Sequence, residues 1–311
     1  MKKLISIVTP CYNEEENIEE LHAQIVQIMS GFPEYDYEHI YIDNASTDQT
    51  IPILRQLAAK DKRVKVILNT RNFGHIRSPF HGLLQAHGDA VVYMVSDLQD
   101  PPHLIKEFIK KWETGNKIVI GIKNRSEESK LFFALRSLYY RILKRLSEVP
   151  LFEDFTGFGL YDQKIIEILR KMDDPYPYLR GLIADICLDV AKINYTQPVR
   201  KRGITKNNFY TLFDMAMLGF TNNTKIPLRM ATFLGFIIAT ISFFVGLFYL
   251  FFKLFNWQEF SLGLAPLVVG LFFLGGVQLL FLGIIGEYIG AIYTHVKHRP
   301  RVIEKERINF D

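Results

Sequence analysis

Two long apolar segments restrict what this chain can fold into. No charged residue occurs from Met230 to Phe252 or from Phe260 to Gly286. Each segment exceeds the roughly 20 apolar residues that a helix needs to cross the hydrocarbon core of a bilayer. Buried helices of a soluble protein rarely run this long without a polar face. The sequence therefore predicts a hairpin of two transmembrane helices, at about 230–252 and 262–286.

The charges around these segments predict their orientation. Basic side chains flank the outer ends of the pair, at Lys225, Arg229, Lys297, His298, Arg299 and Arg301. The link between the segments, from Lys253 to Glu259, carries one charge of each sign. Positively charged flanks stay on the cytoplasmic side of a membrane. We therefore expect a multi-pass protein of the cytoplasmic (inner) membrane, with both termini in the cytoplasm.

The composition excludes several classes of protein. The formal net charge of +4 over 311 residues gives no case for nucleic-acid binding. The two cysteines, Cys11 and Cys187, are too few for a disulfide framework or a zinc site. The apolar run Leu4–Val8 is shorter than a signal-peptide core, and no cleavage site follows it. The N-terminal part is therefore expected to stay in the cytoplasm.

Short apolar runs alternate with amphipathic segments before the first long apolar segment. Strands are predicted at 4–8, 39–42, 64–68, 90–95 and 118–121, and helices at 14–29, 50–59, 77–86, 129–147 and 163–172. This alternation predicts an α/β domain with a doubly wound, mostly parallel sheet. Ligands of such sheets bind outside the carboxyl ends of the strands. Acidic turns follow the second and fourth strands, so a ligand site is expected there.

Asp43 and Asp97 each stand at the end of an apolar strand, so the fold would bring both to one edge of the sheet. Mg²⁺ and Mn²⁺ take oxygen ligands, typically one or two carboxylates together with substrate phosphates. Asp97 and Gln99 would supply such oxygens. The alternative is that Asp97, Asp100 and Pro101 only end a strand and cap a helix, as acidic turns commonly do.

Four segments along the chain form a recognisable set. They are Val8–Glu15 (VTPCYNEE), Asp43–Thr50 (DNASTDQT), Ser96–Pro102 (SDLQDPP) and Gly286–Pro300, which closes the second apolar segment. In order and spacing they resemble the signatures of family 2 glycosyltransferases. Within that family the chain is similar to polyprenyl-phosphate glycosyltransferases, which include dolichyl-phosphate mannose synthases and bacterial undecaprenyl-phosphate sugar transferases. The resemblance covers nearly the whole chain and implies a GT-A-type fold.

The resemblance also implies roles for particular residues. The nucleotide-sugar donor would be bound by Pro10, Tyr12, Glu14, Asp43, Asn44 and Arg71. Asp43 would lie near the base or ribose, and Arg71 would contact phosphate. Asp97 would hold Mg²⁺ or Mn²⁺ on the donor diphosphate, with Gln99 as a further oxygen ligand.

Two positions depart from the family pattern. Val95 replaces the first acidic residue of the D-x-D motif, and Gly157 stands where some relatives carry a proposed base. Glu153 and Asp154 are then the candidates for a base. The implied acceptor is a lipid phosphate, whose second pKa of about 6 makes it largely a dianion at neutral pH. Such a nucleophile needs no general base, so the departures do not imply an inactive protein.

The run Arg200–Lys206 precedes the first apolar segment and is rich in cations. Bringing a lipid phosphate toward a diphosphate is unfavourable, since one like-charge pair at about 4 Å costs about 4 kcal/mol at an effective dielectric constant near 20. The resemblance places Arg202 and Lys206 near the acceptor phosphate, where they would offset this repulsion. Alternatively, the run only orients the protein and binds anionic lipid headgroups.

The predicted organisation has four parts. Residues 1–199 form the nucleotide-sugar-binding domain, 200–229 a basic juxtamembrane segment with helices, 230–292 the transmembrane hairpin and 293–311 a cytoplasmic tail. The resemblance implies inverting transfer of a sugar from a nucleotide sugar to a polyprenyl phosphate, with undecaprenyl phosphate as the expected acceptor.

Other possibilities stay open. Val95 and Gly157 are compatible with a membrane-tethered protein that binds a nucleotide sugar without transferring it. A polysaccharide synthase fits less well, because two apolar segments are too few for a polymer channel and no Gln-x-x-Arg-Trp motif occurs. The pair Gly286 and Gly290 would allow close helix packing, either within the hairpin or between copies in a homo-oligomer.

Overall fold

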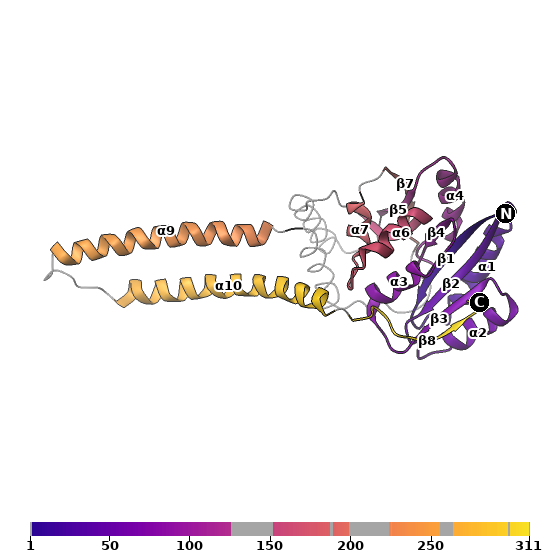
Figure 1. The fold of residues 1–311 in the computed structure, drawn as a ribbon, viewed down its shortest axis with the longest axis horizontal. Helices are drawn as coiled ribbons and strands as arrows, with labels where there is room; N and C mark the ends of the chain where they lie inside the picture. Colours follow the sequence, from indigo (N-terminus) through magenta and orange to yellow (C-terminus); the bar gives the residue numbers. More distant parts are fainter. Residues whose placement is uncertain are drawn as a thin grey trace.

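The computed structural model describes residues 2–125, 152–186, 189–198, 224, 226–255, 264–297 and 299–310. An α/β body carries the N-terminal residues, and two long helices extend from one side of it (Figure 1). Several predicted features lie outside the described residues, namely the helix at 129–147, Cys187, the run Arg200–Lys206 with Arg202 and Lys206, Lys225 and His298.

The body is built around one sheet, whose eight described strands follow the order β7-β5-β6-β4-β1-β2-β3-β8. Their bounds are β1 Lys3–Cys11, β2 Tyr35–Asp43, β3 Val64–Asn69, β4 Ala90–Tyr93, β5 Ile118–Arg125, β6 Phe155–Asp162, β7 Val190–Thr196 and β8 Glu304–Ile308. The first five strands contain or overlap the five predicted runs. The last three were not predicted.

Strands β4, β1, β2 and β3 are neighbours and run parallel. Their carboxyl ends therefore meet at one edge of the sheet, hereafter the carboxyl edge. β6 lies antiparallel between β4 and β5, β7 is parallel to β5, and β8 is antiparallel to β3. Four of these seven pairings are parallel, so the predicted βαβ half is parallel and the further strands make the sheet mixed.

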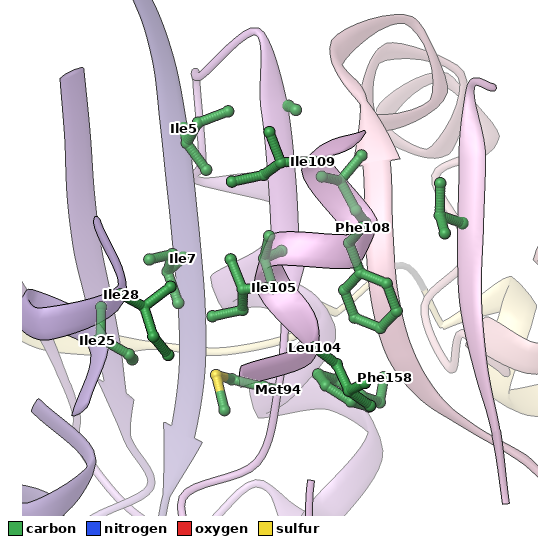
Figure 2. Close-up of a cluster of buried hydrophobic side chains, with 14 of the residues drawn as sticks. Ile5, Ile7, Ile25, Ile28, Met94, Leu104, Ile105, Phe108, Ile109 and Phe158 are labelled. Atoms are coloured by element: carbon green, nitrogen blue, oxygen red, sulfur yellow. The ribbon is translucent and has the colours of Figure 1, made fainter. Parts of the chain in front are cut away.

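Helices cover both faces of the sheet. Their bounds are α1 Ile18–Met29, α2 Thr50–Lys60, α3 Gly74–Leu84, the 3-10 helix η1 Pro102–Leu104, α4 Ile105–Glu113, α6 Gln163–Met172 and α7 Leu179–Asp185. Successive side chains of a strand point to opposite faces. Ile5 and Ile7 of β1 therefore pack with Ile25 of α1 and Ile105 of α4 (Figure 2), whereas Val8 packs on the other face with α3. Burying each such side chain contributes about 1.5–3 kcal/mol.

The C-terminal residues add strand β8 to the free edge of β3 (Figure 1). The amide of Asn309, just after β8, donates to the carbonyls of Ala58 and Val64 at 2.8 Å each. The segment 293–311, expected as a cytoplasmic tail, therefore contains a strand of the sheet that the sequence did not predict. The reason is compositional, because the strand reads Glu-Lys-Glu-Arg-Ile and lacks the apolar run that predicted the other strands.

Helices α9 (Ile226–Phe255) and α10 (Leu264–Val296) run side by side away from the body (Figure 1). At about 1.5 Å per residue they are roughly 45 and 50 Å long, which exceeds the ~30 Å hydrocarbon core of a bilayer. Both are longer than the predicted segments at 230–252 and 262–286. Within the described residues, Ile226–Val245 and Phe273–Val296 are long and apolar enough to cross a membrane.

Many of the described apolar side chains of these helices are exposed. Phe233 and Phe236 are 71% and 72% exposed. An exposed apolar surface of this extent indicates association with a membrane. At Gly286 and Gly290, an added Cβ would meet no atom of the described residues within 4 Å. Of the two possibilities for this pair, packing within the hairpin or between copies, the first therefore finds no support among the described residues.

The end of α10 is held against the body by two acidic residues that follow α6. The Arg301 guanidinium donates to the Asp173 carboxylate at 2.7 Å and to the Asp174 carbonyl at 2.6 Å. His295, in the last turn of α10, lies 3.8 Å from the Asp174 carboxylate. The hairpin is thus anchored to the body through side chains as well as through the chain itself.

Candidate active site

The loops after β1 and β2 hydrogen-bond to each other at the carboxyl edge. The Asn13 side chain accepts the N–H of Thr47 at 2.8 Å, and the Asn13 N–H donates to the Ser46 hydroxyl at 2.9 Å. Asn13 and Ala45 have left-handed backbone conformations, with φ of 56° and 64°. Such conformations are uncommon for residues with a side chain and persist where the surrounding contacts enforce them. These hydrogen bonds therefore join the two loops into one wall at the carboxyl edge of the sheet.

Three predicted donor-site residues belong to this wall. Pro10 is the second-last residue of β1, and Tyr12 and Glu14 follow the strand. The Glu14 N–H donates to the Thr50 hydroxyl at 2.9 Å, and the Glu14 carboxylate accepts the Asn17 amide at 2.6 Å. Glu14 therefore connects the end of β1 to the beginnings of α1 and α2.

Asp43, the last residue of β2, is fully buried. Its carboxylate accepts hydrogen bonds from the N–H of Ser46, at 2.9 Å, and from the Ser46 hydroxyl. Burial raises the pKa of Asp43, and the bonds from Ser46 act against that rise. The side chain thus closes its own turn, a use that the spacing Asp43-x-x-Ser46 permits. The contact of Asp43 with a base or ribose stays a prediction.

Asn44 uses all four hydrogen-bonding positions of its amide within the protein. The oxygen accepts the N–H of Phe73 at 2.8 Å and the Asn69 amide at 3.2 Å. The nitrogen donates to the Asn72 oxygen at 2.9 Å and to the Gly74 carbonyl at 3.1 Å. An amide offers two acceptor and two donor positions, so none is left for a ligand. Asn44 therefore positions the loop after β3, whereas the sequence predicted a donor contact.

That loop carries the predicted phosphate ligand Arg71 and leads into α3. The Arg71 guanidinium is exposed and lies 3.9 Å from the centroid of the Phe73 ring. Arg77, in the first turn of α3, was not singled out from the sequence. Its guanidinium lies 5.0 Å from the Tyr176 ring, and among the described residues its buried Nε–H has no hydrogen-bond acceptor. A buried donor of this kind calls for a partner such as water or an anion.

Asp97 lies in the turn that follows β4, at the same carboxyl edge. It is partly exposed, and its carboxylate accepts the N–H of Gln99 at 3.1 Å. Leu98 between them has a left-handed conformation, with φ of 59°. A β4 turn held in this way presents the Asp97 and Gln99 side chains from a fixed backbone. Val95, in the first position of the D-x-D pattern, contributes no oxygen from its side chain.

Asp100 closes this turn from inside the protein. It is 3% exposed; its carboxylate accepts the Val95 N–H at 3.3 Å and the Tyr195 hydroxyl at 3.0 Å. Burial is the main reason that the pKa of Asp100 is raised to about 7. No side chain caps η1, so the alternative that Asp97 and Asp100 serve as helix caps finds no support at η1. The bond to Tyr195 could not be predicted, since β7 was not recognised.

The turn after β4 offers side-chain oxygens for a divalent cation. The described residues include no group of three His, Cys, Asp or Glu that would hold a metal by themselves. A cation shared with a substrate diphosphate needs only one or two carboxylates from the protein. Asp97 and Gln99 fit that requirement, because both are partly exposed at the carboxyl edge.

Asp154 and Gly157 lie at the beginning of β6. Asp154 has φ of 55°, and its carbonyl accepts the Lys123 N–H at 3.2 Å. Gly157 has φ of 107°, and a Cβ there would lie 3.3 Å from the Tyr93 ring. Any other residue at Gly157 would be strained. The backbone conformation therefore explains why position 157 carries glycine and no acidic residue. Asp154 is the described carboxylate nearest to Gly157 in sequence.

Comparison with known proteins shows the family of this chain. The family model described as glycosyl transferase family 2 matches residues 6–169. The chain is 33% identical to the bactoprenol glucosyl transferase of Shigella phage SfV over 302 residues, which cover 97% of this chain and 98% of that protein. It is 31% identical to the prophage bactoprenol glucosyl transferase homolog of Escherichia coli K12, with the same coverage of both chains.

Among solved structures, the chain is similar to glucosyl-3-phosphoglycerate synthase from Mycobacterium tuberculosis, solved with Mn²⁺, UDP-glucose and phosphoglyceric acid. The TM-score is 0.44 at 19% identity, covering 70% of this chain and 78% of that one. The matched family segment spans β1 to α6 and includes the turns that hold Asp43 and Asp97. The chain, an α/β protein of GT-A type with two apolar helices, belongs to glycosyltransferase family 2.

Proposed function

We propose that this glycosyltransferase moves a sugar, with inversion at the anomeric carbon, from a nucleotide sugar to a polyprenyl phosphate at the cytoplasmic face of the membrane. The observation that carries the proposal is the extent of similarity to proteins named bactoprenol glucosyl transferases, which covers 97% of this chain. That extent includes most of the α/β body and the two apolar helices. A lipid acceptor also accounts for the attachment of a sugar-nucleotide domain to a membrane hairpin.

The donor would bind at the wall formed by the loops after β1 and β2. Pro10, Tyr12, Glu14 and Asp43 belong to this wall, and Asn44 holds the loop that carries Arg71. Arg77 is a further cation at the start of α3, where the N-terminal end of the helix itself favours an anion. Arginine side chains and a helix N-terminus together suit the diphosphate of a nucleotide sugar.

Asp97 and Gln99 would hold Mg²⁺ or Mn²⁺ against the donor diphosphate. When bound, such a cation supplies positive charge that stabilises the leaving diphosphate. Because Val95 offers no carboxylate, the protein contributes less negative charge here than a full D-x-D motif would. The metal is then held largely by the donor phosphates, and its binding should depend strongly on the nucleotide.

Arg202 and Lys206 would neutralise the acceptor phosphate as it approaches the sugar. A phosphate monoester is largely a dianion at neutral pH, because its second pKa is about 6. It can attack without transferring a proton, so Asp154 is needed only if the acceptor arrives protonated. Cations on the acceptor side reduce the repulsion between the two phosphate-bearing substrates.

The membrane arrangement that fits this function is a cytoplasmic α/β body on a two-helix hairpin. Strands β1 and β8 share one sheet, so the chain before α9 and the chain after α10 lie on the same side. The basic flanks assign that side to the cytoplasm. A reporter fused after residue 311 should behave as cytoplasmic and one inserted at residue 256 as external. Two reporters on the same side would contradict this arrangement.

Transfer can be tested with the full chain in detergent micelles. The protein is incubated with labelled nucleotide sugars, one at a time, in the presence of Mn²⁺ and undecaprenyl phosphate. We expect one label to enter the organic phase only when the lipid is present. Label that binds but stays on the nucleotide would favour the non-catalytic binding protein suggested by Val95 and Gly157. Label in a water-soluble polymer would favour a polysaccharide synthase.

A further inference from the structure

A buried hydrogen bond joins the turn that holds Asp97 to a distant edge of the sheet. The Tyr195 hydroxyl of β7 donates to the Asp100 carboxylate at 3.0 Å, although the two residues are 95 positions apart in the chain. Strands β5 and β6 separate β7 from β4 in the sheet. The side chain of Tyr195 must therefore extend across β5 and β6 to reach Asp100. Contacts with residues of these two strands define its path.

The path depends on a glycine in β5. A Cβ at Gly121 would lie 3.1 Å from the Tyr195 ring and 2.9 Å from the Phe158 ring, closer than side chains pack. The rings of Phe158 and Tyr195 meet edge to face, with centroids 5.6 Å apart and an interplanar angle of 83°. Gly121 and Phe158 thus pack against the tyrosine in the orientation in which its hydroxyl donates to Asp100.

Asp100 also closes the turn after β4, which carries the proposed metal ligands Asp97 and Gln99. Its second carboxylate oxygen accepts the backbone N–H of Val95 at 3.3 Å, which closes the turn from Val95 to Asp100. Leu98, in the middle of that turn, has a left-handed backbone with φ of 59°. A non-glycine residue in that conformation needs outside contacts to persist. Asp97 and Gln99 flank Leu98, so the direction of their side chains depends on the closure of the turn.

We propose that Asp100 and Tyr195 are a positioning pair, which holds the turn in the conformation that lets Asp97 and Gln99 share a divalent cation with the donor. Neither residue touches the donor or the cation in this scheme. The inference rests on the proposed function, because it takes the metal site from there. In this proposal a tyrosine on β7 partly sets the affinity of the site for the cation. This tyrosine lies outside the family 2 match at residues 6–169.

A purely structural pair would behave differently from a positioning pair. If the bond only stabilises the body, Tyr195→Phe should lower the melting temperature and leave the affinity for Mn²⁺ unchanged. If it positions the turn, the affinity for Mn²⁺ should fall even at temperatures where the variant is fully folded. The two readings are separated by a binding measurement that needs no lipid acceptor.

The test uses the full chain in detergent, with Mn²⁺ binding followed by electron paramagnetic resonance in the presence of UDP and, in parallel, GDP. We expect Tyr195→Phe to raise the half-saturating Mn²⁺ concentration about five- to tenfold. Asp100→Asn keeps the shape but loses one acceptor, and should have an effect in the same direction. The matched control is Tyr35→Phe, which removes a hydroxyl bond to the Glu113 carboxylate at the opposite edge of the sheet. It should bind Mn²⁺ as the wild type does.

Each outcome has a distinct meaning. Unchanged Mn²⁺ affinity in both Tyr195→Phe and Asp100→Asn would overturn the positioning role while leaving the proposed function intact. Failure of the wild type to bind Mn²⁺ with either nucleotide would overturn the metal site and this inference with it. Recovery of transfer by Tyr195→Phe at high Mn²⁺ would support the positioning role, since a variant that had lost its fold would not recover.

Discussion

The side-chain oxygen of Asn44 accepts the backbone N–H of Phe73 at 2.8 Å, and so joins the end of β2 to the loop after β3. Asn44→Ala would leave this N–H and one N–H of the buried Asn69 amide without their acceptor, while the Asn69 amide keeps its bond to the Ser78 hydroxyl. Unpaired buried donors cost about 1–3 kcal/mol each, so we expect a clear loss of stability. Because the same loop carries Arg71, the donor concentration for half-maximal rate should also rise. Thermal unfolding and donor titrations measure the two effects.

A suitable control for that variant is Asn116→Ala. Asn116 is half-buried, and among the described residues its side chain bonds to Lys111 in the last turn of α4 and to Thr114 just after that helix. Its removal should leave both measurements within error of the wild type. Equal donor titrations for Asn44→Ala and Asn116→Ala would mean that the Asn44 network has no part in donor binding.

Asp97→Asn tests the metal ligand. The amide keeps the size of the side chain but removes the negative charge, so Mn²⁺-dependent nucleotide binding should weaken strongly. The transfer rate should fall about a hundredfold or more, as for other losses of transition-state charge stabilisation. Asp36→Asn, which alters an exposed carboxylate at the start of β2, serves as the control. A turnover near that of the wild type in Asp97→Asn would remove the residue from the metal site.

Arg202→Ala and Lys206→Ala separate an acceptor site from a general attraction to lipid. If the two cations contact the acceptor phosphate, each variant should lose about a hundredfold in rate, with donor binding unchanged. Lys201→Ala, in the same basic run, should lose little. Losses of less than about threefold in both variants correspond to well under 1.4 kcal/mol and would favour headgroup binding. Initial rates with undecaprenyl phosphate provide the measurement.

Strand β8 should contribute far more to stability than its ion pairs do. Deleting residues 302–311 removes the buried Val302 and leaves β3 as an open edge, so we expect aggregation of the purified protein. Glu306→Ala breaks only the pair with Arg55, whose side chains are 37% and 46% exposed, respectively. Pairs this exposed contribute about 0–1 kcal/mol. Size-exclusion chromatography and thermal unfolding distinguish the two results.

The buried imidazole of His39 predicts acid sensitivity. Burial lowers the pKa of His39 well below 6.5, and burial also lowers the pKa of His22, which stacks on it. Below pH 6.5 the unfolded chain therefore binds more protons than the folded one, and the free energy of unfolding falls as the pH falls. The melting temperature should drop between pH 7.5 and 5.5, and less so in His39→Gln. The raised pKa of Asp100 makes the free energy of unfolding rise as the pH falls, but this contribution is the same in the wild type and in His39→Gln.

The exposed His87 offers the control for this pH series. His87→Gln should follow the pH dependence of the wild type, because its ring is not buried by folding. If His39→Gln shows the same slope as the wild type, the acid sensitivity arises elsewhere in the protein.

Sequence patterns predicted the strands that carry continuous apolar runs, such as Leu4–Val8, but missed β6, β7 and β8. β6 contains Gly157 and Gly159, and glycine weakens a strand signal. Gly159 is nevertheless required, since a Cβ there would collide with the Val119 carbonyl oxygen. β8 is mostly charged, and it becomes a strand because β3 offers it a free edge. Both are tertiary effects that local patterns do not contain.

The candidate site, like the sheet, was predicted from the sequence only in part. The rule that ligands gather at strand ends placed Asp97 at the carboxyl edge, where the structure also has it. The contacts of Asn44 were not foreseen, because its partners Asn69 and Phe73 lie 25 and 29 residues away. Tyr195 was missed for the same reason. Spacing along the chain predicts which residues reach an edge, but not which of them bind each other there.

The place of β8 in the chain has a consequence for biosynthesis. Arg55 and Glu306, which pair across the completed body, are 251 residues apart. At about 5–20 residues per second, the ribosome needs roughly 10–50 seconds to make the intervening chain. During that interval β3 has no partner on its outer side, while α9 and α10 are already available for insertion. The sheet is therefore completed only after the two apolar helices have been made, so faulty insertion of these helices would leave an open strand for chaperones or proteases to recognise.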